Sequence, residues 1–200
     1  MRGGAFHPAF FFRSVMTVIV SMLRGVNVGG HNLSSMAALR ALYESLGFED
    51  SQTYIQSGNV VFRTKERNLT ALGAKIGSAI EQKFGFRPGV VLRTPSELRH
   101  VIAANPFAKR AGIEPAKLHV MFLSTPLAAE VQKQLLALNS GPEELRIVGR
   151  ELYVYYPEGA GKSKLFPVLL GHTLKNSGTS RNWNTVTKLL KMAEELEAGK

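Results

Sequence analysis

The chain has 200 residues, of which 44% are hydrophobic, and carries a formal net charge of +10 at pH 7. It contains no run of the roughly 18 apolar residues that a membrane helix requires, so we expect no membrane partner. It contains no cysteine, which excludes disulfides and thiolate chemistry and fits a reducing cytoplasm. The excess of basic over acidic residues favours partners that bear phosphate groups, namely nucleic acid or a phosphate-bearing small molecule such as a nucleotide.

The first fifteen residues precede the first predicted strand. They combine Arg2 and Arg13 with three phenylalanines at 10–12, but no small-residue cleavage site follows before that strand. We therefore expect residues 1–15 to be a leader that is not part of the fold, and Met16 to be the natural start.

Residues 16–110 are predicted to form a first half with the element order β-α-β-β-α-β, which is the ferredoxin-like split unit. Turn and capping residues mark the element boundaries. The expected elements are a strand at 17–23, a helix from Met36 capped by Ser34 or Ser35, a hairpin turning around Ser57-Gly58-Asn59, a helix capped by Asn68, and a strand at 90–93.

Residues 111–200 are predicted to repeat this order. A helix with a capping box at Thr94-Pro95-Ser96-Glu97 leads towards the boundary near residue 110. The expected elements are a strand at 118–123, a helix starting at Thr125-Pro126, a hairpin turning at Gly149-Arg150, and a final helix that carries Val186. The predicted fold is α+β, with two ferredoxin-like (βαββαβ-type) halves whose antiparallel sheets are packed by helices.

A glycine-rich loop follows the first strand, at Gly25-Val26-Asn27-Val28-Gly29-Gly30. Polar groups on such a loop, at the end of a central strand, are typical of a site. The glycine spacing is not that of the dinucleotide fingerprint. His31 stands in this loop, where it would either serve as a hydrogen-bonding group or general base, or stabilise the loop.

A second glycine-rich segment, Gly159-Ala160-Gly161-Lys162-Ser163, resembles the tail of a phosphate-binding loop. The full pattern would need glycine in place of Tyr156. Arg181, at the predicted start of the last helix, would bind an anion together with Lys162 and Lys164. The alternative is that Arg181-Asn182-Trp183 anchors that helix.

Catalytic and metal-binding patterns are weak. The five histidines have no ligand spacing, so we expect no metal site. Ser57 lacks the context of a nucleophile elbow, and no paired acids are apparent. The sequence therefore assigns no catalytic residue and implies no cofactor.

Three separated segments, at 23–32 (followed by Met36 and Leu39), 54–62 and 179–185, resemble the bacterial family described as domain of unknown function 1697. The resemblance implies a small cytoplasmic α+β protein with ferredoxin-like halves and no established activity. It also implies a shortlist of ligand-binding positions: Arg24, Asn27, Gly29, His31, Asn32, Gln56, Ser57, Asn59, Arg181, Asn182 and Trp183. Because strand ends and hairpins of a split unit lie close together, we expect Arg24, Asn27, Gln56 and Asn59 to share a cleft.

Three functions remain open from the sequence. The first is a binding module for a phosphate-bearing ligand, and its single-strand form requires exposed aromatic side chains on a sheet face. The second is a small enzyme with a polar pocket around Arg24, His31 and Gln56. The third is a structural or oligomerising protein, in which the same residues only stabilise turns and the contact between halves.

Overall fold

The computed structural model describes residues 16–137, 141–169 and 178–199; the predicted leader at 1–15 lies outside them. It contains two four-stranded antiparallel sheets, with strand orders β2-β3-β1-β4 and β6-β7-β5-β8. Both orders are ferredoxin-like, so the predicted α+β fold with two similar halves is confirmed. No helix in the described part of the chain is long and apolar enough to cross a membrane.

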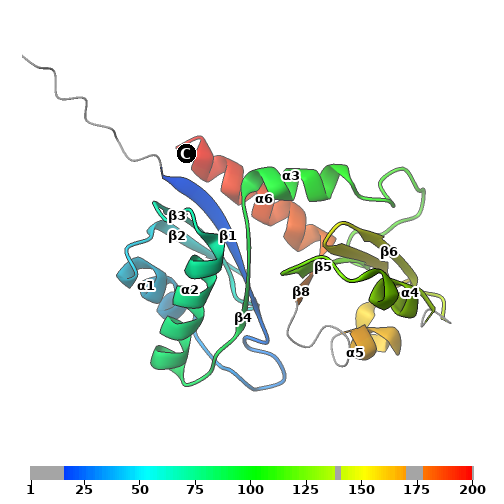
Figure 1. Cartoon of the computed structure of the whole chain (residues 1–200), viewed down its shortest axis with the longest axis horizontal. Coiled ribbons are helices and arrows are strands. Elements are labelled where there is room, and N and C mark those ends of the chain that lie inside the picture. Colours follow the sequence, from blue (N-terminus) through cyan, green and yellow to red (C-terminus); the bar gives the residue numbers. More distant parts are fainter. Residues whose placement is uncertain (1–15, 138–140, 170–177, 200) are drawn as a thin grey trace, which may run out of the picture.

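In the first half, helices α1 and α2 cover one face of the sheet (Figure 1). The elements are β1 (Thr17–Arg24), α1 (Met36–Ser45), β2 (Glu49–Tyr54), β3 (Asn59–Thr64), α2 (Leu69–Phe84) and β4 (Gly89–Arg93). The side chains of Ser35 and Asn68 cap the two helices, as predicted. The hairpin turn lies at 55–58, earlier than predicted, because Ile55 and Gly58 adopt positive φ and Asn59 already belongs to β3.

In the second half, helices α4 and α5 lie on the outer face of their sheet (Figure 1). The elements are β5 (Leu118–Leu123), α4 (Ala129–Ala137), β6 (Glu144–Val148), β7 (Glu151–Tyr155), the 3₁₀ turn η1 (Ala160–Lys162), α5 (Leu165–Val168) and β8 (Gly178–Asn182). Helix α4 begins at Ala129 rather than at Thr125-Pro126. The side chain of Gln132 donates to the carbonyl of Leu127, and this bond holds the irregular segment before α4 against the first turn of that helix.

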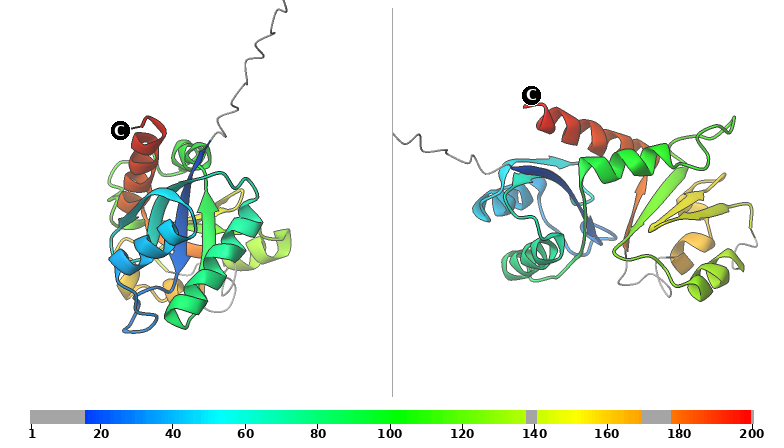
Figure 2. Two further views of the ribbon diagram at one scale, coloured as in Figure 1. Left: turned by 90° about the vertical axis from the view of Figure 1, so that its left-hand side faces the viewer. Right: turned by 45° about the horizontal axis from the view of Figure 1, so that its top comes forward.

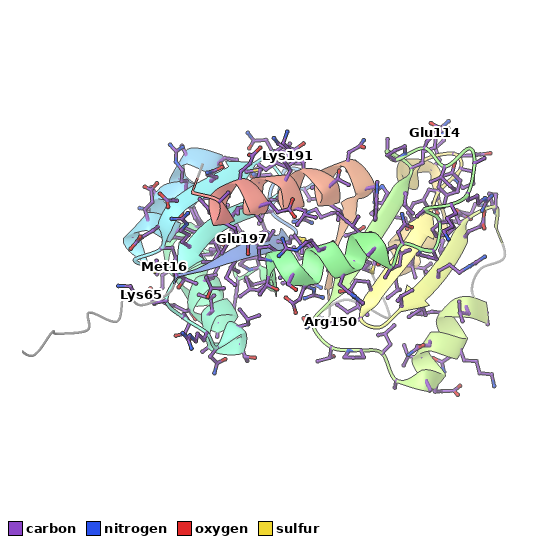
Figure 3. The ribbon with its side chains drawn as sticks, turned by 90° about the horizontal axis from the view of Figure 1, so that it is seen from above. Met16, Lys65, Glu114, Arg150, Lys191 and Glu197 are labelled. Atoms are coloured by element: carbon purple, nitrogen blue, oxygen red, sulfur yellow. The ribbon has the colours of Figure 1, made fainter. Side chains whose placement is uncertain are left out.

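The remaining faces of the two sheets are buried against two further helices, α3 (Pro95–Ala103) and α6 (Trp183–Glu197). Seen from above, α3 and α6 lie side by side and reach across both sheets (Figure 3), and the side views show the same arrangement (Figure 2). One hydrophobic cluster joins both sheets to both helices; its members include Val20, Val120, Leu98 and Leu189. The two halves therefore share a core.

The two halves are related by an approximate twofold repeat that is visible in the strand register. Val20 pairs with Arg93 in the first sheet, and Val120 pairs with Arg181 in the second. Met22 likewise pairs with Asn59, and Phe122 with Glu151. Each arginine is followed by a residue whose side chain caps a helix, Thr94 for α3 and Asn182 for α6. The repeated unit thus consists of seven elements, with the order βαββαβα.

Candidate functional site

Arg181 is the most buried of the predicted site residues that carry a charge, with 7% of its surface exposed. Its guanidinium makes five hydrogen bonds of 2.5–2.9 Å. Three cross to the first half and reach Asn59 Oδ1 and the carbonyls of Leu23 and Ser57; the other two reach Thr179 Oγ1 and the carbonyl of Ser180. Because all five N–H groups are engaged within the protein, the predicted anion-binding role of Arg181 is wrong. Arg181 joins the two halves.

Burial of Arg181 lowers its pKa to about 10, which leaves the side chain charged at neutral pH. No carboxylate among the described residues lies within ion-pair distance, so carbonyl and amide oxygens alone stabilise the charge. Oxygen acceptors of this kind are what a buried guanidinium requires when it has no counterion.

Arg93 occupies the equivalent position in the first half and reaches into the second. Its Nε and Nη2 donate to Glu151 Oε1 at 3.2 and 3.0 Å, and Nη2 also donates to the carbonyl of Leu123 at 2.7 Å. Its Nη1 donates to the carbonyl of the preceding residue, as the Nη1 of Arg181 does. The two arginines therefore make reciprocal contacts across the interface, with Glu151 in the place of Asn59.

The glycine-rich loop is held by the side chains of two asparagines with positive φ, Asn27 and Asn32. Asn27 Nδ2 donates to the carbonyls of Ser34 and Gln56 at 2.9 and 3.0 Å, and its Oδ1 accepts from Ser34 N at 2.8 Å. Asn32 Nδ2 donates to the carbonyl of Gly25 at 2.9 Å. The bond from Asn27 to Gln56 fastens the loop to the β2–β3 turn, and the bond from Asn32 to Gly25 closes the loop on itself.

The predicted cleft of Arg24, Asn27, Gln56 and Asn59 is a hydrogen-bonded contact instead. Asn27 meets the backbone of Gln56, and Asn59 is fully buried and donates to the carbonyl of Tyr54 and to Ser57 Oγ. Arg24 is half-buried and pairs with Gly89 of β4. The structure thus brings Asn27, Gln56 and Asn59 together, in a role that stabilises the fold.

The other shortlisted residues fall into an exposed group in the loop and a group at the start of α6. Gly29, His31 and Asn32 are exposed at the tip of the loop. Asn182 caps α6 by accepting from the N–H of Thr185 at 2.9 Å, and Trp183 packs against the shared core. Asn182 and Trp183 thus act at the start of α6, whereas the Arg181 side chain joins the two halves.

A pocket of about 540 Å³ lies in the second half, on the side that faces away from the interface helices. It is formed where the chain enters β6 and where it leaves β7. Its lining consists of residues 141–143, 156–159, 162–165 and Val168. The volume is within the usual range for small-molecule sites.

Lys162 and Lys164, both predicted to bind an anion, line this pocket and are exposed. Neither makes an ion pair within the described part of the chain. The amides of this segment do not form a phosphate-binding loop, because the N–H groups of Lys162 and Ser163 already donate to the carbonyls of Gly159 and Ala160 at 3.1 and 3.2 Å. The positive charges at the pocket therefore come from lysine side chains rather than from backbone amides, and the carboxylates of Glu143 and Glu158 line the same pocket.

Sequence reasoning missed Glu143, which is 9% exposed and lines the same pocket. Ser163 Oγ donates to Glu143 Oε1. Burial, together with the nearby charge of Glu143, raises the pKa of Tyr156, another lining residue, so its hydroxyl stays protonated. An isolated glutamate in a loop gives no sequence signal; only the fold brings it within reach of Ser163.

His119 lies behind this pocket, with its ring against Tyr156 and Phe166 and its Nδ1 3.4 Å from Ser180 Oγ. Burial lowers its pKa from 6.5 to about 4. The unfolded chain therefore binds a proton that the folded chain excludes, and stability falls as pH drops from about 6.5 towards 4, by about 3 kcal/mol at 1.36 kcal/mol per pKa unit.

We expect His119→Gln to remove this part of the pH dependence. Urea unfolding between pH 7.5 and 4.5 measures it, with the exposed His100→Gln as a control that keeps the wild-type slope. Parallel curves for His119→Gln and wild type would contradict the assignment.

Among the described residues, no group of three or more His, Asp or Glu side chains could hold a metal ion. The pocket offers two carboxylates, two ammonium groups and hydroxyls, which bind ligands by hydrogen bonding and charge.

Comparison with known proteins gives a family and a fold. The family described as "Protein of unknown function (DUF1697)" matches residues 16–153. The solved structure of the conserved bacterial protein SP0830 from Streptococcus pneumoniae is similar with a TM-score of 0.69 and 23% sequence identity, covering 90% of this chain and 99% of that chain. No curated protein matches the sequence. The family resemblance seen in the sequence is thus confirmed, and the structural likeness supports the fold.

Proposed function

Because the chain belongs to the DUF1697 family, whose description names no activity, we propose its function from the pocket of the second half: the protein binds a small phosphate-bearing ligand there. The observation that carries this proposal is the presence of two lysines without carboxylate partners, Lys162 and Lys164, on a pocket of about 540 Å³. Lysine ammonium groups are common ligands for phosphate.

A small ligand is favoured over single-stranded nucleic acid by the burial of the sheet faces. Ferredoxin-like proteins that bind single strands stack bases on aromatic residues of an open sheet face. Here that face of each sheet is covered by the other half and by α3 and α6. Of the two aromatic residues in the β2–β3 hairpin, Phe62 is fully buried and Tyr54 packs against the shared core.

The proposal includes a cytoplasmic location, which a chain without cysteine fits. In this proposal the glycine-rich loop has a structural role, because the side-chain amides of Asn27 and Asn32 hydrogen-bond to the loop and to the neighbouring turn.

Titration calorimetry of the full chain with adenosine 5′-monophosphate tests the proposal. We expect Lys162→Gln and Lys164→Gln each to weaken binding about ten-fold, which corresponds to about 1.4 kcal/mol for the loss of one charge-assisted contact. Lys83→Gln is the matched control, because Lys83 is an exposed lysine of α2 in the other half. Wild-type affinity in both pocket variants would contradict the proposal.

A parallel titration with labelled single- and double-stranded oligonucleotides at several salt concentrations separates the alternatives. Oligonucleotide binding could fall steeply with salt and be equally strong in Lys83→Gln, Lys162→Gln and Lys164→Gln. This result would show that the binding site is a dispersed basic surface and not the pocket. Binding of the mononucleotide with little or no binding of oligonucleotides would support the pocket.

A further inference from the structure

Glu143 places a carboxylate in the same pocket as the two lysines. Its Oε1 accepts from Ser163 Oγ, whereas Oε2 has no hydrogen-bond partner within the described part of the chain. The residue is 91% shielded from solvent, because 9% of it is exposed. Oε2 itself opens onto the pocket, where water or the hydroxyl of a ligand can donate to it.

Gly141 makes room for this carboxylate. A Cβ at position 141 would lie 2.2 Å from Glu143 Oε2, a distance that forces the carboxylate to move. The absence of a side chain at Gly141 therefore allows Glu143 to fold back into the pocket rather than extend into solvent. The space at Gly141 admits the carboxylate, and the hydrogen bond from Ser163 Oγ holds it.

The two kinds of charge set opposite requirements for a ligand. Lys162 and Lys164 attract a phosphate, while Glu143 repels it and accepts hydrogen bonds from hydroxyl groups. A ligand that satisfies both carries a phosphate and, a few bonds away, hydroxyl donors. Carboxylates that bind the hydroxyls of a ribose are an established mode of sugar recognition.

We propose that the pocket takes a sugar phosphate, free or as part of a ribonucleotide, with its phosphate at Lys162 and Lys164 and its vicinal hydroxyls donating to Glu143 Oε2. This inference rests on the proposed function and adds the class of ligand. It makes Glu143 the residue that selects the sugar and the lysines the residues that hold the phosphate.

Calorimetric titration of the full chain with inorganic phosphate, ribose 5-phosphate and 2-deoxyribose 5-phosphate tests it. Wild type should prefer ribose 5-phosphate over the deoxy sugar by about ten-fold, the value of one hydrogen bond to a charged group. Glu143→Gln should reduce this preference to about two-fold and leave inorganic phosphate bound as well as before or more tightly. Glu158→Gln, which changes an exposed carboxylate of the same lining, should keep the wild-type preference.

Gly141→Ala provides a second variant that keeps Glu143 and moves only its carboxylate, and it should lose the preference in the same way. Thermal melting checks that both variants are folded. A wild-type protein that binds inorganic phosphate but treats the two sugars alike would overturn the role of Glu143 and leave the phosphate proposal standing. Binding of none of these three ligands and no binding of adenosine 5′-monophosphate would overturn both proposals.

Adenosine 5′-monophosphate, titrated alongside, distinguishes the source of the sugar phosphate. Affinity at least ten-fold above that of ribose 5-phosphate supports a ribonucleotide, because the base would then contribute contacts of its own. Equal affinity supports the free sugar phosphate.

Discussion

Replacing Arg181 with methionine is expected to lower the free energy of unfolding by about 4 kcal/mol. The guanidinium donates to three acceptors of the first half, and methionine would leave the oxygens of Asn59, Leu23 and Ser57 without this donor inside the protein. Each buried polar group that loses its partner costs about 1–3 kcal/mol. For a chain of this length, the loss corresponds to a melting temperature lower by roughly 8–16 °C.

Urea unfolding and thermal melting of the full chain measure this effect. Arg181→Lys keeps the charge but has fewer donors and no planar fork, so we expect about half the loss. Arg99→Met is the matched control, because Arg99 also joins the two halves, through Glu194 and Glu197, but is exposed. Its loss should be far smaller than that of Arg181→Met, because ion pairs between exposed side chains are screened by solvent. An Arg181→Met protein within 1 kcal/mol of wild type would show that the interface does not depend on this residue.

Replacing Glu151 with alanine is expected to cost about 3–5 kcal/mol, because it leaves the buried charge of Arg93 without its partner. Arg93 is 2% exposed, and burial, followed by the neighbouring charge of Arg150, already lowers its pKa. Loss of the carboxylate at 3.0 Å removes the interaction that opposes both effects. The measurement is the free energy of unfolding in urea at neutral pH.

The approximate repeat gives this second prediction an internal comparison. Glu151→Asn introduces the residue type that holds Arg181 in the other half, where an amide oxygen suffices. We therefore expect Glu151→Asn to cost less than half as much as Glu151→Ala. The double variant Arg93→Met/Glu151→Met removes both charges together and should be more stable than Glu151→Ala alone. Equal losses for the Asn and Ala variants would contradict this account of the interface.

Most of the fold was predictable because its elements carry local signals. Asn68 at a helix start, the Thr94–Glu97 capping box and the Gly149-Arg150 turn mark boundaries that depend on neighbouring residues alone. The location of strand β8 was not predicted, because Thr179 and Arg181 give it polar residues at buried positions. Those residues are buried by hydrogen bonds to the first half, and a sequence pattern does not contain such contacts.

The candidate site was predictable only in part, for the same reason. Lys162 and Lys164 stood out because glycines surround them, and they do line a pocket. Arg181 stood out equally, but its role depends on Asn59, 122 residues away in the chain. Glu143 had no signal at all, since its significance comes from Ser163, which lies twenty residues further along.

The shared core and the reciprocal arginines have a consequence for assembly. Two separate βαββαβα units would have to meet in solution to bury the same faces, and dilution would then separate them. Within one chain each unit has its partner tethered at an effective concentration on the order of millimolar, so the pairing survives at any protein concentration. Because the two units belong to one chain, their sequences can also differ from each other. One unit can hold its arginine with an amide and the other with a carboxylate, and the lysine pocket can develop in one unit while the other keeps the fold intact.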